Sequence, residues 1–505
     1  MYHNGMYHFF YQYNPRGPTW GDGKLSWGHS VSGDLVNWAD VGNALDPTSP
    51  FDVNGCWSGS ATVLPGGRPG ILYTGMDDAD KAQVQNVAFA KNPSDPLLRE
   101  WEKPSCNPVI PMPADVTGNN FRDPTEAWRG RDGLWRVAVA AERDGDSPAV
   151  LECPDLFPMA APGAMEGLDV SASRAGVLHV LKLSDFAKED HYMVGRYDEE
   201  EDTFTPAEPE RGGDCGNWRR LDHGHLYASK SFYDARKKRR VLWAWVDETD
   251  GGGEARGWAG IQPFPRAMWL DTDGKRLVQW PVEEIETLRR KRVGLQWATE
   301  VEAGDTKEIA GIVSSQADVE VVFEVPNLED AEALDPKWLQ DPKGLCAEKG
   351  ASVPGGVGPF GLLVMASGDL KERTAIFFRV FKHLDTYKVL MCTDLTKRGK
   401  NPVLRDISGR GRGEGQEPVA QNTDRSHGGG ELRRRREDVH DGSRVPGARG
   451  DEKQPAVRVQ LWRRRREGVQ ARGVGAGNSG RERWRRYIAR LRRAEVERRA
   501  LHDNL

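Results

Sequence analysis

The feature that most limits the fold of this chain is a series of short aromatic and β-branched runs along residues 1–280. Such runs occupy residues 7–13, 71–74, 134–140 and 240–246. Turn signals such as Asn4-Gly5 and Asp273-Gly274 separate runs of this kind. Strands at this spacing, without helical periods between them, predict an all-β sandwich, barrel or propeller. The pattern by itself does not choose among these three folds.

The pattern changes after residue 280. Val282, Ile285 and Leu288 recur at helical spacing, with acids early and arginines late, so we predict a helical linker over residues 281–297. Residues 298–398 return to strands, and their apolar runs lie at 319–325 and 375–381.

Residues 399–505 differ from the rest in composition. From residue 401 onward there are 25 Arg, 1 Lys and 15 acids, so this part carries a net charge of +11 and residues 1–400 carry −16 of the overall −5. The segment has no Phe and few aliphatic residues, which predicts a disordered basic tail. The excess of Arg over Lys favours the hypothesis that this segment is a GC-rich coding sequence translated in the wrong reading frame. An arginine-rich nucleic-acid-binding segment is the alternative.

Charge and cysteine content narrow the class of protein. The acidic body argues against nucleic acid as its partner. The sequence contains no run of about 20 apolar residues, so it predicts no membrane-spanning helix. Met1 is not followed by the basic and apolar segments of a signal peptide. The six cysteines include no Cys-x-x-Cys pair, so we expect no metal and no cofactor. Spacing alone leaves open whether Cys346 and Cys392 are free thiols or a disulfide.

Two carboxylates stand in unusual sequence contexts. Glu152 lies between Leu151 and a Cys-Pro pair, and loss of hydration beside apolar neighbours favours the protonated form of an acid. A protonated acid can give its proton to a leaving group. Asp123 follows Arg122 and precedes a rigid proline. Carboxylates, one arginine and exposed tryptophans are what a sugar-cleaving site needs.

Six motifs, in this order, resemble glycoside hydrolase family 32, the plant acid invertases and fructan exohydrolases. They lie at residues 7–15, 27–30, 57–60, 121–124, 152–155 and 227–232, and the resemblance extends to about Thr396. It implies a five-bladed β-propeller over residues 1–280, with the site where the blades converge, and a β-sandwich over 298–398. It also implies a Cys346–Cys392 disulfide.

The resemblance implies roles for individual residues. Glu152 matches the general acid/base, and Asp123 matches the transition-state stabiliser that holds two fructose hydroxyls. Arg122 would keep Asp123 ionised and contact the same sugar. Other matches line the fructose pocket: Gln12, Trp20, Trp57 and Ser58. Asp222 and Lys230 match a stretch near the acid/base, although surface positions are the alternative.

The chain departs from the family in two places. The family's attacking Asp belongs to an Asn-Asp-Pro-Asn-Gly word, and no acid occurs here before Asp22, so we expect no measurable turnover. Met1 aligns directly after that motif, so we expect the first strand to be missing. The segment between Asp123 and Glu152 is short, so we also expect part of one blade to be missing. A catalytically dead fructoside-binding propeller is therefore the alternative function.

Substrate and location follow from the resemblance as well. Pro154 resembles the cell-wall-type members. Arg256 takes the position of a Lys that helps invertases hold the glucose of sucrose, which favours fructan exohydrolase activity over invertase activity. We expect a monomer whose substrate is sucrose or fructan, located in the cell wall, with the vacuole as the second choice.

Overall fold

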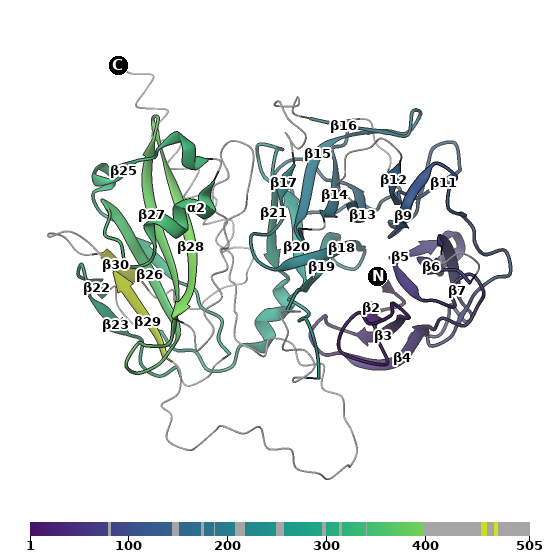
Figure 1. The fold of residues 1–505 in the computed structure, drawn as a ribbon, viewed down its shortest axis with the longest axis horizontal. Coiled ribbons are helices and arrows are strands. Elements are labelled where there is room, and N and C mark those ends of the chain that lie inside the picture. Colours follow the sequence, from purple (N-terminus) through teal and green to yellow (C-terminus); the bar gives the residue numbers. More distant parts are fainter. Residues whose placement is uncertain are drawn as a thin grey trace, which may run out of the picture.

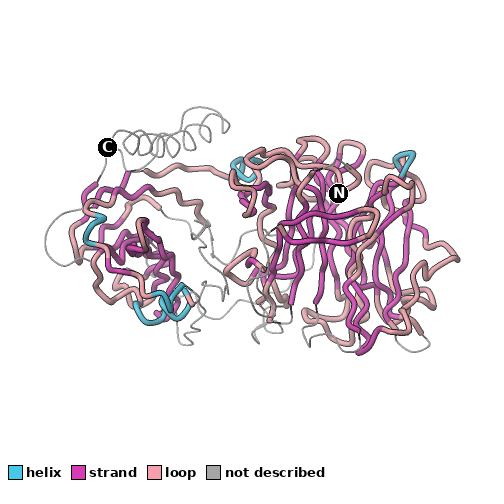
Figure 2. The backbone as a smooth tube through the Cα atoms, turned by 90° about the horizontal axis from the view of Figure 1, so that it is seen from above, coloured by secondary structure: helices cyan, strands magenta, loops and turns pink. Residues whose placement is uncertain are grey.

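The computed structural model consists of two lobes, one built from strands β1–β21 and the other from strands β22–β30 (Figures 1 and 2). The structure describes residues 1–78, 82–143, 151–172, 176–185, 187–207, 218–248, 257–294, 299–312, 316–339, 341–397, 456–461 and 469–472.

The first lobe is a five-bladed β-propeller in which each blade is made of strands that follow one another in sequence. Blade 1 contains β1 (Tyr2–His3), β2 (Met6–Tyr13), β3 (Ser26–Ser32) and β4 (Ala39–Leu45). Blade 2 contains β5 (Cys56–Leu64), the 3₁₀ turn Pro65–Gly67, β6 (Arg68–Met76), β7 (Gln83–Ala90) and β8 (Trp101–Glu102). Blade 4 contains β13 (Leu151–Pro158), β14 (His179–Asp185), β15 (Asp190–Asp198), β16 (Thr203–Pro206) and β17 (Arg219–Arg220). Blade 5 contains β18 (Leu226–Asp234), β19 (Arg239–Val246), β20 (Arg266–Leu270) and β21 (Leu277–Pro281).

Blade 3 is the smallest blade. Its strand β9 (Val116–Arg122) pairs directly with β12 (Ala140–Arg143), while β10 (Trp128–Arg129) and β11 (Trp135–Arg136) form a separate two-residue ladder. The run predicted as one strand over 134–140 is thus divided between two ladders. The reason is that Trp135 and Arg136 fold back on β10, whereas Ala140 pairs with Arg122.

The first and last blades pack together and close the ring. Tyr7 and Leu35 of blade 1 share a buried cluster with Phe232 and Val241 of blade 5. The Tyr7 hydroxyl also donates a hydrogen bond of 3.1 Å to Asp234 Oδ2. Burial of this apolar area stabilises the contact between blades 1 and 5.

The second lobe is a β-sandwich. One sheet has the order β22 (Thr299–Val301), β30 (Val469–Arg472), β24 (Val322–Glu324). The other has the order β23 (Thr306–Glu308), β29 (Ala456–Leu461), β26 (Val357–Ala366), β27 (Arg373–His383), β25 (Glu332–Ala333), with β28 (Thr386–Lys397) also paired to β27. Buried side chains such as Val301, Phe360 and Val380 form its core. The disulfide that the family resemblance implies joins Cys346 to Cys392.

The helical prediction for residues 281–297 needs correction. The segment forms a 3₁₀ helix over Glu283–Leu288 that buries none of its own residues, and Val282 offers no side-chain cap. Val282 and Ile285 pack against the cluster that blades 1 and 5 share, but a helix this short without an N-cap gains little stability of its own. The α-helix of the described chain is instead α2 (Pro342–Lys349), which Asp341 caps through Gly344 N at 2.8 Å, and short 3₁₀ helices occur at Leu328–Asp330 and Pro336–Leu339.

The prediction of a disordered tail over residues 399–505 is wrong for two segments. Strand β29 pairs with both β23 and β26, and β30 pairs with both β22 and β24. Each segment supplies a strand to one sheet of the sandwich. The backbone groups that form a strand ladder are the same in every sequence, so pairing mainly requires that apolar and polar side chains alternate between the two faces. The apolar residues of 456–461 alternate with polar ones in this way.

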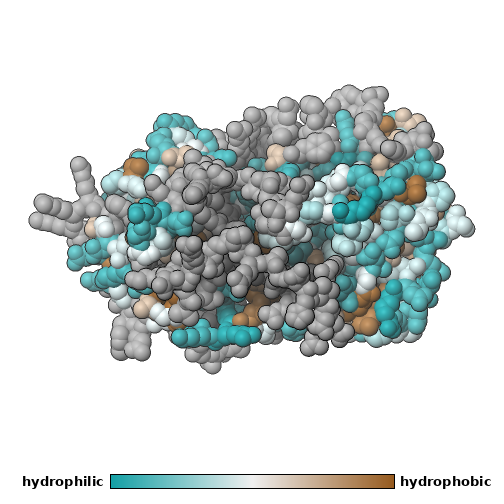
Figure 3. All heavy atoms as spheres, turned by 60° about the horizontal axis from the view of Figure 1, so that its bottom comes forward, coloured by the Kyte–Doolittle hydropathy of each residue, from teal (hydrophilic) through white to brown (hydrophobic). Residues whose placement is uncertain are grey.

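On the face drawn in Figure 3 the described surface is mostly hydrophilic, with small hydrophobic areas on both lobes. The exposed large apolar side chains include Trp20, with 52% of its surface exposed. No described helix has the length and apolarity to cross a bilayer.

Candidate active site

Arg122, Asp123 and Glu152 come together between blades 3 and 4. Arg122 is buried and donates two hydrogen bonds to Glu152 Oε1, from Nε at 3.1 Å and from Nη2 at 2.8 Å. Its Nε also lies 3.9 Å from Asp123 Oδ2. One guanidinium therefore contacts both predicted catalytic carboxylates, although they lie 29 positions apart in the sequence.

Backbone irregularities aim these two acids into the site. The ladder between β13 and β14 changes register between Glu152 and Asp155, and Cys153 within that bulge has φ +47°. Asp123 itself has φ +67°. Positive φ is uncommon for residues other than Gly, and such residues and bulges gather at functional sites.

The Asp123 carboxylate is almost fully buried and bound by the neighbouring blade. Its Oδ2 accepts a hydrogen bond of 2.9 Å from the backbone N–H of Cys153. The backbone N–H of Asp123 in turn donates to Thr74 Oγ1 of blade 2 at 2.9 Å. Burial, followed by the charge of Asp123, raises the pKa of the Cys153 thiol well above its usual value, so Cys153 stays neutral.

Tyr227 is a site residue that sequence reasoning did not single out. Its hydroxyl donates a hydrogen bond to Glu152 Oε2, so the two oxygens of Glu152 have different donors. Burial, followed by this hydrogen bond, raises the pKa of Tyr227, which therefore remains a donor. The signal available in the sequence is that Tyr227 begins the sixth family motif.

The predicted pocket residues lie on blades 1 and 2. The indole rings of Trp20 and Trp57 are edge to face with centroids 5.1 Å apart, and Trp57 Nε1 donates to Gly23 O at 2.8 Å. The Gln12 amide fits with its nitrogen donating to Cys56 O at 3.2 Å and its oxygen accepting from Trp27 Nε1 at 2.9 Å.

Ser58 lies in the bulge of β5, where the register with β6 changes between Cys56 and Gly59. Two residues further on, Ser60 Oγ donates to Pro124 O at 2.9 Å. This bond ties the tryptophan-bearing strand to the turn that carries Asp123.

The three residues named with less support have different positions. Lys230 is close to the catalytic pair, because its Nζ donates to the carbonyl oxygen of Asp123 at 3.1 Å. Asp222 is buried and pairs with Arg266 Nη1 at 2.7 Å. Burial acts to raise the pKa of Asp222, but the Arg266 charge outweighs it and the pKa is lowered, as in a structural ion pair. Arg256 lies outside the described residues.

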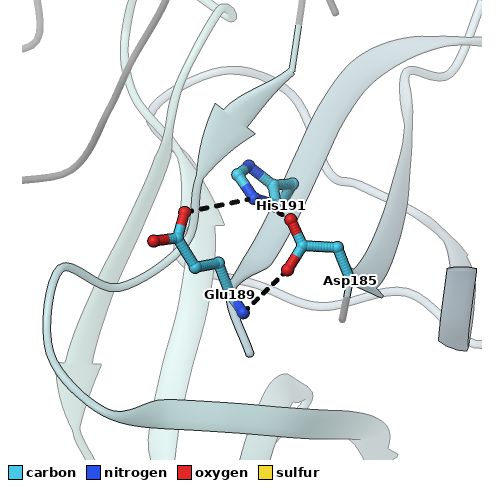
Figure 4. A group of neighbouring side chains, drawn as sticks. All are labelled: Asp185, Glu189 and His191. Carbon is cyan, nitrogen blue, oxygen red and sulfur yellow. Dashed lines mark hydrogen bonds and ion pairs between the residues drawn. The ribbon is translucent and has the colours of Figure 1, made fainter. Parts of the chain in front are cut away.

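A group of possible metal ligands lies on the β14–β15 turn (Figure 4). Asp185 Oδ2 is 3.2 Å from His191 Nε2, and Glu189 Oε2 is 3.7 Å from the same nitrogen. Arg220 Nη1 already neutralises Glu189 at 2.8 Å. The three side chains therefore already have partners in one another and in Arg220.

An arginine between two carboxylates on a β-propeller, with paired tryptophans at the neighbouring blades, fits a glycoside-hydrolase type of site. The model of the glycosyl hydrolases family 32 N-terminal domain matches residues 1–151 and 142–281. The chain therefore belongs to glycoside hydrolase family 32.

Known relatives include plant enzymes of two activities. Beta-fructofuranosidase, insoluble isoenzyme 7, from Oryza sativa subsp. indica is 65% identical over 427 residues, which cover 79% of this chain and 71% of the relative. Fructan 6-exohydrolase from Triticum aestivum is 60% identical over 447 residues, 81% of this chain and 75% of the relative. The crystal structure of fructan 1-exohydrolase IIa from Cichorium intybus matches with a TM-score of 0.76 and 38% identity, covering 94% of each chain.

Proposed function

We propose that the site binds a terminal β-D-fructofuranosyl residue of a fructan or of sucrose, and that Glu152 protonates the glycosidic oxygen as that bond breaks. The contact of Arg122 with both Glu152 and Asp123 carries this proposal. Family membership and the two activities among the relatives support it. A variant of the Cichorium enzyme was solved in complex with 1-kestose.

Each residue at the site has a distinct task in this proposal. Asp123 accepts hydrogen bonds from two fructose hydroxyls, and hydrogen bonds to a charged acceptor are the stronger kind. Trp20 and Trp57 offer apolar faces and N–H groups to the sugar ring. Arg122 and Tyr227 hold the Glu152 carboxyl group from either oxygen.

A retaining reaction also needs a carboxylate that attacks the anomeric carbon. Residues 1–21 contain no Asp or Glu. We therefore propose that residues 1–505 bind the fructosyl residue and supply the proton donor, and that turnover needs an attacking acid from the family's Asn-Asp-Pro-Asn-Gly word.

Two further features extend the proposal. The Cys346–Cys392 disulfide suits an oxidising compartment, so we propose the cell wall before the vacuole. We also propose a monomer with a preference for fructan over sucrose, the latter because Arg256 replaces the family's glucose-binding Lys.

The test compares the 505-residue chain with a version extended at its N-terminus by Asn-Asp-Pro-Asn-Gly. Calorimetry measures fructose binding to both, and a reducing-sugar assay measures fructose released from sucrose, 1-kestose, inulin and levan. We expect both versions to bind fructose and the extended version to release it, faster from fructans. Binding without release by the extended version would favour a fructoside-binding protein, and absence of binding would refute the proposal.

A further inference from the structure

The bulges that aim Asp123 and Glu152 leave backbone carbonyl groups without partners in the strand ladders. One bulge lies between Glu152 and Asp155 of β13, and a second lies between Tyr227 and Lys230 of β18, where Ala228 has φ +52°. A buried carbonyl without a hydrogen bond is costly, so these groups need donors from elsewhere.

Two lysine side chains supply those donors. Lys182 Nζ donates to Cys153 O at 3.0 Å and also to Ser229 O, which joins the two bulges. Lys230 Nζ donates to Pro154 O at 2.7 Å and to Asp123 O at 3.1 Å. Two ammonium groups therefore bind carbonyl oxygens that lie in or directly after three strands, β9, β13 and β18.

Holding these lysines inside the propeller is expensive. Lys182 is 2% exposed and lies 3.5 Å from its nearest carboxylate oxygen, Asp190 Oδ2. Three carbonyl oxygens surround Lys230 Nζ, the third being Pro124 O at 3.2 Å. Burial lowers the pKa of Lys230. Charged groups are seldom buried without a reason, and costly charge collects at functional sites.

We infer that Lys182 and Lys230 are positioning residues that set the separation of the Asp123 and Glu152 carboxyl groups. Lys230 donates hydrogen bonds to the carbonyl oxygens of Asp123 and of Pro154, which lies in the strand that carries Glu152. It therefore links blades 3 and 4. Lys182 fixes Cys153, whose N–H holds the Asp123 carboxylate. This inference rests on the proposed function, because the separation matters only if one sugar lies between the two acids.

The experiment replaces each lysine by Met in the 505-residue chain. Lys182→Met and Lys230→Met keep the length and apolar character of the stem but remove the ammonium donor. The matched control is Arg379→Met in the sandwich, because Arg379 Nη2 also gathers carbonyl oxygens, among them Lys349 O at 2.7 Å and Gly350 O at 2.9 Å.

We expect all three variants to lose thermal stability, and only the two lysine variants to lose fructose affinity in calorimetry, by about 10- to 100-fold, because a displaced Asp123 carboxylate would lose a hydrogen bond of the charged kind to a fructose hydroxyl. Lys182→Gln and Lys230→Gln, which keep an N–H donor, should recover part of the affinity, and they serve if a Met variant does not fold. Equal affinity in the lysine variants and the control would overturn the inference.

A second measurement separates this inference from the proposed function. The distance between the Asp123 and Glu152 carboxyl carbons is compared in crystal structures of the unaltered chain and of Lys230→Gln. We expect this distance to change. If the unaltered chain binds no fructose, the proposed function fails, while an unchanged distance would defeat the positioning role whatever the chain binds.

Discussion

The propeller and the sandwich both bury a cation against backbone carbonyl groups, but they do so for different purposes. In the sandwich, Arg379 is 1% exposed and binds carbonyls next to helix α2, far in sequence from any site residue. In the propeller, Lys182 and Lys230 bind the carbonyl oxygens of Cys153 and Asp123, which are or adjoin the two proposed catalytic acids. A buried cation bound to backbone carbonyl oxygens, which costs free energy to bury, stabilises a loop in the sandwich and orders the site in the propeller.

The lobes also differ in how they resist unfolding. The sandwich has a covalent link between Cys346 and Cys392, separated by 46 positions. The propeller closes its ring by packing blade 1 on blade 5. It also buries polar pairs, such as His8 and His29, whose ring nitrogens lie 3.0 Å apart. The propeller should therefore be the lobe that responds to pH and ligand, and the sandwich the lobe that responds to reductant.

Removal of the disulfide should give the largest effect. Cys346→Ala with Cys392→Ala frees a closed loop of this length, which by the chain-entropy relation costs about 4 kcal/mol in the free energy of unfolding. Chemical denaturation measures the loss. Fructose affinity should stay within about twofold, because the link lies in the other lobe; a large fall in affinity would break the comparison.

Acid should weaken the propeller through His29. Burial lowers the pKa of His29 to about 4, from an ordinary value of 6.5, so the folded state needs the neutral ring. The unfolded chain takes up a proton below pH 6.5, so stability is full above that pH and falls until about pH 4, by about 3 kcal/mol.

The variant His29→Gln should flatten this part of the stability curve. Denaturation curves for both proteins between pH 7.5 and pH 4 measure the effect. A matched control is His383→Gln, which alters a histidine of strand β27 in the sandwich. Equal slopes for the unaltered chain and His29→Gln would show that the propeller does not depend on a neutral His29.

Asp123→Asn should weaken fructose binding by about 100-fold, since two hydrogen bonds to a charged acceptor become bonds to a neutral one. Calorimetry with fructose measures the change. Asp369→Asn is the control, because Asp369 is an acid of the sandwich surface that bonds to Ser367. A similar change in both variants would mean that the affinity does not arise at the propeller site.

Trp20→Ala should have the smallest effect, about fivefold in fructose affinity. Half of the Trp20 surface is exposed, and one aromatic contact to a ligand is worth about 1 kcal/mol. Trp258→Ala, at another exposed tryptophan of the propeller lobe, offers a comparison. A larger loss from Trp258→Ala would place the sugar elsewhere.

A strand could be predicted from the sequence where one apolar run forms one strand along its whole length. The runs at 7–13 and 240–246 become Met6–Tyr13 and Arg239–Val246 because each run of aromatic and β-branched residues pairs along its whole length as one strand. The run at 134–140 could not be predicted, since its two ends pair with different strands. Spacing also could not separate a 3₁₀ turn from an α-helix over Glu283–Leu288, because that choice depends on capping and packing.

The site was predictable only as far as motifs reach. Arg122, Asp123 and Glu152 belong to recognisable sequence motifs, and the structure brings them together. Tyr227 and Lys182 reach Glu152 and Cys153 across 75 and 29 positions, which no local pattern reports. The available clue was a lysine at an inward position of the strand His179–Asp185, since Lys182 lies two positions after Val180 and therefore on the same buried face.

The central claim is that a fructosyl ring lies between Asp123 and Glu152. The most direct test is a crystal structure of Glu152→Gln, prepared in the chain extended by Asn-Asp-Pro-Asn-Gly and soaked with 1-kestose. We predict that the terminal fructosyl residue contacts Asp123 and the side chain at position 152, with Trp20 or Trp57 against its ring. A sugar bound away from both acids, or a site empty at saturating 1-kestose, would contradict the account.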